Sequence, residues 1–524
     1  MTKQQQISQL LQSAIKLHQS GQIVPAIPLY RQILALDSRH GDANHLLGLA
    51  LHQTGHDDEA IPLFNRALMI MPDNAACLGN FGELWRKQKN YKKAMECYEK
   101  LLVLTPNDNQ IRELWGEALI KLERYEEAVA YFQKQIDAGK DNADTWWSMS
   151  EILRMMDRVE ESVQASLKAT QMNPNSEGAW HSLGWNLIKI GKVRESIPCF
   201  NRAISLKPDR ALLYWRRAWA LMLLGQYEQA WADYEARWYD EDLQLKDRRP
   251  FPGPLWQGQD LTGKTLFIHL EQGIGDTFQF MRYLPMVQAR GGKLVVEAHS
   301  NFFSLIVRSF PGIEFRHEPV LVPQYDYHLP LLSLPHVFAT TLATVPAKVP
   351  HLVPDRGKVE AWRQRLAGEA GLKVGIAWAG SPMHKNDRQR SIRLQRLAPL
   401  AQVAGVQFVS LQKGPGAEQL AQTPDFKMLD WTEELNDWDD TAALVSALDL
   451  VIAVDTSVAH LAGALARPTW TLLPFAPDFR WMIDRDDTPW YPTMRLFRQP
   501  ALRDWESVVQ TVAQSLRQLA QQGG

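Results

Sequence analysis

Apolar residues recur at helical spacing through the first 240 residues of the chain, and small and aromatic residues return there at an interval of 34. A repeat of this length suits a pair of packed helices. Small residues let the two helices approach closely, a ring fills the space beside them, and proline ends the second helix. The repeating positions are Gly48, Gly82, Gly116 and Gly184; Ala60, Ala94 and Ala128; Phe64, Tyr98, Phe132 and Phe200; and Pro72, Pro106, Pro174 and Pro208.

The same positions extend this array in both directions. A first copy carries Gly21, Ala26 and Tyr30, a seventh carries Gly225, Tyr227, Ala230 and Tyr234, and a degraded fifth carries Ser150, Ser162 and Ser166. These residues resemble the tetratricopeptide repeat, with about seven copies over residues 1–244. The resemblance implies an all-α superhelix whose concave face binds a partner protein.

The pattern changes after residue 244. Prolines and glycines in residues 245–262 indicate a linker. Beyond it, short apolar runs alternate with helical segments, and the predicted strands are 265–270, 293–297, 372–378, 408–411, 450–454 and 469–473. Such alternation is typical of a parallel α/β arrangement. We expect one lobe over 263–354 and another over 355–524, with ligands bound beyond the carboxyl ends of the strands.

The first loop at such a position contains Gly273, Gly275 and Asp276. The glycines permit a tight turn and close approach of the backbone to a ligand. Asp276 begins a helix, so it could simply cap that helix. The loop could instead cradle a phosphate, or Asp276 could act as a general base on an acceptor hydroxyl.

Two further loops carry groups suited to an anion. Residues 379–391 include Ser381, Lys385, Arg390 and Ser391, which could form an ordinary solvated loop or neutralise a diphosphate. After the strand 450–454, Asp455, Thr456 and Ser457 lead into a helix that carries His460 one turn later. Free backbone N–H groups at that helix start favour an anion. A lone histidine is usually structural, but its position here favours ligand contact.

Together, the segment GIGDTFQFMRYLP, the basic loop and the segment VDTSVAHLAGAL resemble the heptosyltransferase-type glycosyltransferases, in particular relatives fused to tetratricopeptide repeats. The resemblance covers roughly residues 260–500. It implies a two-lobed GT-B fold, a bacterial source, a nucleotide-sugar substrate held mainly by the second lobe, and no metal or cofactor. It assigns the catalytic base to Asp276. Contacts to the donor diphosphate fall to Lys385, Arg390, Asp455, Thr456, Ser457 and His460, and position alone suggests Gln412 and Lys413 as contacts to the nucleotide base.

The first lobe is short for a nucleotide-binding half, so either it is trimmed or the repeats complete it. A short acceptor lobe beside a partner-binding array suggests that the acceptor is a protein. The function expected is therefore metal-independent sugar transfer to a protein hydroxyl. The alternative is a non-catalytic scaffold with a degenerate transferase domain. Arg480, Trp481 and Trp490 could border the donor cleft or form a packed loop.

The composition excludes several classes of protein but points to no functional site. With 57 basic and 59 acidic residues, the net charge of −2 provides no general attraction for nucleic acid or an anionic membrane. Cys77, Cys97 and Cys199 are too scattered for a disulfide framework and are expected to be buried. The first residues lack a signal-peptide core, and no apolar run reaches the length of a membrane span. These features predict a cytoplasmic protein.

Overall fold

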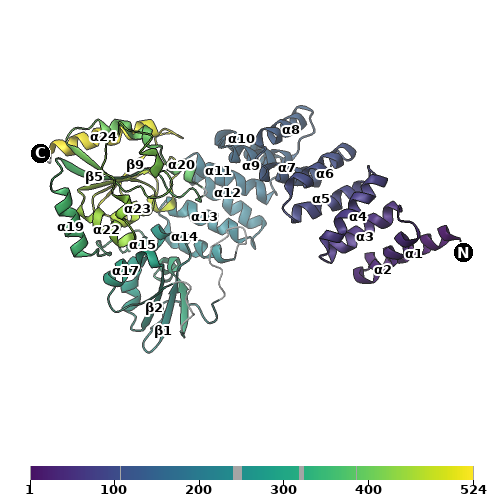
Figure 1. Ribbon diagram of the computed structural model, residues 1–524, viewed down its shortest axis with the longest axis horizontal. Coiled ribbons are helices and arrows are strands. Elements are labelled where there is room, and N and C mark those ends of the chain that lie inside the picture. The colour runs from purple at the N-terminus through teal and green to yellow at the C-terminus, as the bar shows by residue number, and fades with distance from the viewer. Residues whose placement is uncertain (1, 107, 240–250, 318–323, 385, 523–524) are drawn as a thin grey trace. The chain divides into compact units, whose positions relative to one another are not determined.

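The computed structural model describes residues 2–106, 108–239, 251–317, 324–384 and 386–522. It divides into two compact units, Met1–Ser182 and Leu183–Gly524, so that the division falls inside the repeat array. An all-helical tetratricopeptide array is followed by an α/β region with two parallel sheets (Figure 1). This architecture confirms the fold class predicted from the sequence.

The first unit consists of paired helices that follow the 34-residue interval. A Cβ added at Gly82 would lie 2.5 Å from a ring carbon of Tyr98, and one at Gly48 would lie 3.3 Å from Phe64, which explains the glycines. In the degraded copy, the buried Ser162 hydroxyl instead donates to the Ser150 carbonyl at 2.6 Å. The helices are α1 (Lys3–Gln19), α2 (Ile23–Leu36), α3 (Gly41–Gln53), α4 (Asp57–Ile70), α5 (Ala75–Lys87), α6 (Tyr91–Leu104), α7 (Asn109–Lys121), α8 (Tyr125–Asp137), α9 (Ala143–Met155) and α10 (Val159–Met172).

The array continues into the second unit through α11 (Glu177–Lys189), α12 (Val193–Leu206), α13 (Ala211–Leu223), α14 (Tyr227–Tyr234) and the 3-10 turn η1 (Glu235–Trp238). Its last helices pack on the α/β region. The Trp231 indole donates to the Thr340 carbonyl at 3.0 Å, and the Trp490 indole donates to the Tyr227 hydroxyl at 3.1 Å. All of these rings are buried. The last repeats therefore pack on the first lobe through Trp231 and on the second lobe through Tyr227.

The first lobe contains a four-stranded parallel sheet in the order β3-β2-β1-β4. Its strands are β1 (Thr265–His269), β2 (Lys293–Ala298), β3 (Glu314–His317) and β4 (Tyr327–Pro330). The connecting helices are short: α15 (Ile274–Phe280), α16 (Leu284–Gln288), α17 (Phe303–Ser309) and α18 (Leu334–Val337). Only β1 and β2, the two central strands, match strands predicted from the sequence.

The second lobe contains a five-stranded parallel sheet in the order β6-β5-β7-β8-β9. Its strands are β5 (Leu372–Ala377), β6 (Val406–Ser410), β7 (Leu450–Val454), β8 (Thr469–Leu473) and β9 (Met494–Arg498). The helices named in this lobe are α19 (Arg356–Leu366), α20 (Asp387–Arg390), α21 (Ala398–Ala401), α22 (Trp438–Ala447), α23 (Ser457–Ala464) and α24 (Trp505–Gln522). The edge strand β9 was not predicted.

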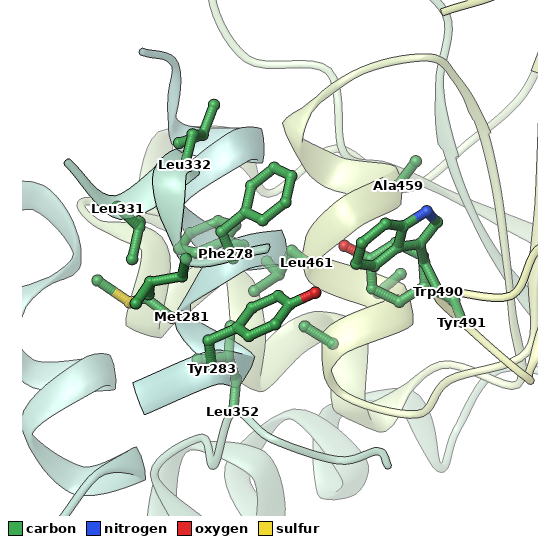
Figure 2. Close-up of a cluster of buried hydrophobic side chains, with 14 of the residues drawn as sticks. Phe278, Met281, Tyr283, Leu331, Leu332, Leu352, Ala459, Leu461, Trp490 and Tyr491 are labelled. Carbon is green, nitrogen blue, oxygen red and sulfur yellow. The ribbon is translucent and has the colours of Figure 1, made fainter. Parts of the chain in front are cut away.

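One hydrophobic core joins the two lobes to the end of the repeat array. Figure 2 shows part of it, where Phe278 of α15 lies beside Leu461 of α23, with Trp490 and Tyr491 close by. A separate core lies under α24. Because the lobes share a core, the loops at their facing strand ends are held near one another.

The structure also bears on the expectations about membrane-spanning helices and about the three cysteines. None of the helices within the described ranges combines the length and apolar character needed to span a bilayer. Cys77, Cys97 and Cys199 are free and buried, as predicted, and burial raises the pKa of the Cys77 thiol to about 12.

Candidate functional site

A cavity of about 650 Å³ lies between the two lobes. Four loops line it, each following a strand: β1, β5, β7 or β8. This is where ligands bind in parallel α/β sheets. The predicted site residues in its lining are Gly273, Gly275, Asp276, Ser381, Arg390, Asp455, Thr456, Ser457 and His460. The structure thus brings together the three loops singled out in the sequence, whose predicted site residues in the lining lie between positions 273 and 460 of the chain.

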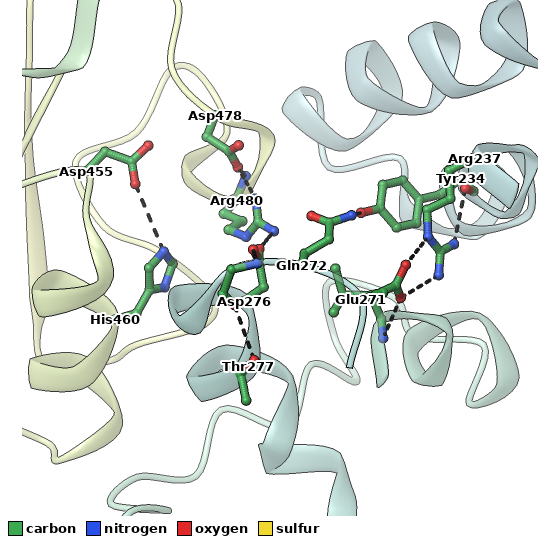
Figure 3. A network of polar contacts seen from close by, with 12 residues as sticks. Tyr234, Arg237, Glu271, Gln272, Asp276, Thr277, Asp455, His460, Asp478 and Arg480 are labelled. Atoms are coloured by element: carbon green, nitrogen blue, oxygen red, sulfur yellow. Dashed lines mark hydrogen bonds and ion pairs between the residues drawn. The ribbon is translucent and has the colours of Figure 1, made fainter. Parts of the chain in front are cut away.

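Asp276 lies in the first turn of α15, where one carboxylate oxygen accepts the Gly273 N–H at 3.0 Å. Its other oxygen forms an ion pair with Arg480 (Figure 3). The Asp276 side chain is 19% exposed, and burial raises its pKa above the usual range while Arg480 opposes that rise. The capping contact and the placement at the cavity are both present, so one does not exclude the other.

Arg480 also lines the cavity, which agrees with one of the two interpretations left open by the sequence. Its Nη1 lies 2.7 Å from a carboxylate oxygen of Asp478, and its guanidinium lies 4.3 Å from the centre of the Phe479 ring. Its Nε is buried and has no hydrogen-bond partner among the described residues. Trp481 and Trp490 are instead packed: Trp481 stacks on His460 at 5.1 Å, and Trp490 belongs to the shared core.

The loop after β7 places a carboxylate and an imidazole side by side. Asp455 Oδ1 lies 4.0 Å from His460 Nε2, and His460 Nδ1 lies 3.0 Å from the Tyr491 hydroxyl (Figure 3 shows the first pair). Burial lowers the pKa of His460 well below its usual value, so the ring is neutral at neutral pH. Burial and the nearby Asp478 carboxylate raise the pKa of Asp455 to about 6. Thr456 caps α23 by accepting the Val458 N–H at 3.2 Å.

Gly275 sets the distance between the lobes at the cavity. A Cβ at this position would lie 2.8 Å from a ring carbon of His460 and 3.5 Å from the Ser457 Cα. The first is shorter than real Cβ contacts allow, so with any side chain here either the His460 ring or one of the two helices must shift. The glycine predicted to allow close approach to a ligand therefore also allows close approach of a helix.

The basic loop was predicted to contribute Lys385 and Arg390. Arg390 lines the cavity and lies 3.4 Å from Asp387, whereas Lys385 falls outside the described residues. Ser391 does not line the cavity; its hydroxyl accepts the Gly380 N–H and donates to Asp387. The lining also includes His384, Asn386 and Gln389, which the sequence did not single out.

Gln412 and Lys413 are not among the residues that line the cavity. Gln412 is buried, and its amide is used within the lobe: the oxygen accepts the N–H groups of Trp378 and Ala379, and the nitrogen donates to the carbonyls of Ala379 and Pro415. Lys413 donates to the Leu435 carbonyl. Position after a strand was a poor guide here, because a long polar side chain can turn back to satisfy its own loop.

The repeat array holds the loop that carries Asp276. Arg237 of η1 is fully buried and forms a bidentate pair with Glu271, at 2.9 and 2.8 Å (Figure 3). Glu271 raises the pKa of Arg237, so this guanidinium stays charged. The neighbouring Gln272 donates to the Tyr234 hydroxyl at 3.0 Å. Sequence reasoning missed both contacts; Tyr234 stood at a repeat marker, but nothing marked Arg237.

Family models match the repeat array. The model described as a tetratricopeptide repeat matches residues 19–76 and 181–243, and the model described as anaphase-promoting complex, cyclosome, subunit 3 matches residues 53–135. Protein FlbA of Caulobacter vibrioides (strain ATCC 19089 / CIP 103742 / CB 15) is 30% identical over 320 residues, which cover 56% of this chain and 53% of FlbA. The chain thus spans about half the length of that relative.

Solved structures of repeat proteins are also similar to parts of the chain. A tetratricopeptide repeat protein from Parabacteroides merdae is 18% identical, with a TM-score of 0.38, over 44% of this chain and 91% of its own. PilF of Pseudomonas aeruginosa is 17% identical, with a TM-score of 0.31, over 39% of this chain and 94% of its own. From the family models and the helix pairs together, the first 243 residues contain an array of tetratricopeptide repeats.

Proposed function

We propose that this protein is a glycosyltransferase that moves a sugar from a nucleotide-sugar donor to a hydroxyl of a protein held by the repeats. The observation that carries the proposal is the cavity itself. Its lining combines the Asp276 loop with the loops around Arg390 and Asp455, at strand ends of both sheets. Its volume of about 650 Å³ lies in the range usual for sites that hold small molecules and cofactors.

In the proposed reaction, Asp276 accepts the proton of the acceptor hydroxyl. The acceptor oxygen forms a bond to the anomeric carbon of the sugar, the bond from that carbon to the diphosphate oxygen breaks, and the nucleoside diphosphate leaves with the electron pair. Burial supports the role of Asp276, because a carboxylate whose pKa is raised is a stronger base.

Charge that develops on the leaving diphosphate needs donors already in place. Arg390 and Arg480 line the cavity, and α23 begins there at Ser457, so the positive end of its helix dipole favours an anion. The proposal therefore takes its positive field from side chains and backbone and is metal-independent.

The first test is a thermal-shift screen of the purified chain against nucleoside diphosphates and nucleotide sugars. A ligand that binds only the folded state raises the melting temperature by mass action. A selective shift is expected for one nucleotide class. If no nucleotide shifts the melting temperature and no sugar is transferred, the alternative of a non-catalytic scaffold with a degenerate domain is favoured.

The second test examines the role of Asp276 as the general base. With the donor identified by the screen, Asp276→Asn should lower turnover by about 10²- to 10⁴-fold, the usual contribution of a general base, while the variant still binds donor. Asp487→Asn is the matched control, since that side chain is 65% exposed and lies outside the cavity lining. Wild-type turnover in Asp276→Asn would exclude Asp276 as the base.

A further inference from the structure

Arg480 has hydrogen-bonding capacity that the described residues do not use. Its side chain is 8% exposed, and its two Nη atoms contact carboxylates, one from Asp478 and one from Asp276. Its Nε–H is buried without a partner among the described residues, and Arg480 is one of the residues that line the cavity. Leaving a buried charged donor unpaired is costly, so such a group points to a ligand that supplies an acceptor.

The surroundings of Arg480 favour an anionic ligand. Thr456 and Ser457, at the start of α23, line the same cavity, as does Arg390. The planar guanidinium of Arg480 rests against the Phe479 ring, and Asp478 accepts both its Nη1–H and its backbone N–H. A guanidinium fixed in this way presents a fork that matches phosphate oxygens.

Arg480 is shared between two carboxylates in a cavity whose described lining holds more carboxylates than guanidinium groups. The described lining residues include four carboxylates and two guanidinium groups, those of Arg390 and Arg480. Glu271 is paired with Arg237, which leaves Asp276, Asp455 and Asp478 beside the two lining arginines. Arg480 is occupied by two of these carboxylates. An incoming diphosphate therefore competes with Asp276 for the same cation.

We propose that Arg480 binds the diphosphate of the donor by leaving Asp276, so that donor binding releases the Asp276 carboxylate to accept the proton of the acceptor. This inference rests on the proposed function and adds a donor-binding residue to it. The exchange orders the reaction, because Asp276 is the stronger base once its cation has moved to the diphosphate. Donor therefore binds before the acceptor is activated.

The test measures the affinity of the full chain for inorganic pyrophosphate and for ADP, CDP, GDP, UDP and dTDP by titration calorimetry. Arg480→Gln should weaken binding about 30-fold or more, as expected when a buried charged partner is lost. Arg480→Lys keeps the charge but loses the fork and should recover only part of the affinity. Arg485→Gln is the matched control, because Arg485 pairs with Asp487 outside the cavity lining.

Asp276→Asn separates the proposal from simple loss of folding. Removing the competing carboxylate should tighten pyrophosphate or nucleotide binding about tenfold, because one nearby negative charge is lost and Arg480 is freed. A misfolded variant cannot bind more tightly. Unchanged or weaker binding by Asp276→Asn, in a variant that melts as the wild type does, would overturn the exchange.

The remaining outcomes distinguish the inference from the function on which it rests. If the wild type binds a nucleoside diphosphate and Arg480→Gln binds it equally well, Arg480 is not a donor contact although the proposed function stands. If the wild type binds pyrophosphate but no nucleotide, the diphosphate site is supported and the nucleotide donor is contradicted. If the wild type binds neither, both proposals fail.

Discussion

Asp455 is a buried carboxylate whose cost to the fold can be worked out from its surroundings. Its side chain is 12% exposed, and its pKa is raised from 3.8 to about 6 by burial and by the neighbouring Asp478 carboxylate. The folded protein therefore binds a proton at Asp455 more tightly than the unfolded chain does. We expect Asp455→Asn, which removes the charge and keeps the shape, to stabilise the protein at neutral pH.

The sign and size of the effect of Asp455 on stability follow from proton linkage. Between about pH 4 and pH 6 the folded state holds more protons than the unfolded state, so this group lowers wild-type stability as the pH rises through that window. The cost is complete above pH 6, where a shift of about two units corresponds to about 3 kcal/mol. At pH 5 the same shift costs about 1.5 kcal/mol, because the folded protein is still largely protonated at Asp455.

Urea unfolding at pH 5 and at pH 8, followed by tryptophan fluorescence, measures this difference. Asp455→Asn should raise the free energy of unfolding of the second unit by about 3 kcal/mol at pH 8 and by about half as much at pH 5. The exposed Asp487→Asn serves as the control and should give no pH-dependent gain. An equal gain at both pH values, or a loss at pH 8, would refute the assignment of a raised pKa to Asp455.

Two other substitutions test the packing around the cavity. Gly275→Ala places a methyl group 2.8 Å from an imidazole carbon on α23, so it should cost about 1–3 kcal/mol by overpacking, whereas Gly368→Ala, with nothing within 4 Å, should be nearly neutral in thermal melting. Arg237→Met leaves Glu271 buried without its cation and should cost about 3–5 kcal/mol, measured by urea unfolding, while the exposed Arg363→Met should change little. Recovery of stability in Arg237→Met combined with Glu271→Gln is expected, and its absence would contradict the ion-pair explanation.

Local chemistry made the repeats and the central strands readable from the sequence. Glycine and an aromatic residue recur at the positions of Gly82 and Tyr98 because the ring occupies the space that a Cβ on the glycine would need. The same packing requirement applies within each repeat, so it can be read from the sequence. The central strands are buried on both faces and so appear as continuous apolar runs. The strands that the sequence missed, β3, β4 and β9, are all edge strands. The partly exposed Arg316 and the exposed Arg495 interrupt the apolar run in β3 and β9, and the buried His328 interrupts it in β4.

The sequence also indicated which loops would meet, because strand ends in parallel sheets converge at one edge. It could not place side chains whose partners lie far along the chain. Arg480 pairs with Asp276, 204 residues away, and Arg237 pairs with Glu271 across the junction of repeats and lobe. The partners of Gln412 were missed for the same reason, since its amide oxygen accepts the N–H groups of Trp378 and Ala379. Periodicity and strand order determine elements; which polar atoms meet depends on the tertiary fold, because burial forces each to find a partner wherever the chain supplies one.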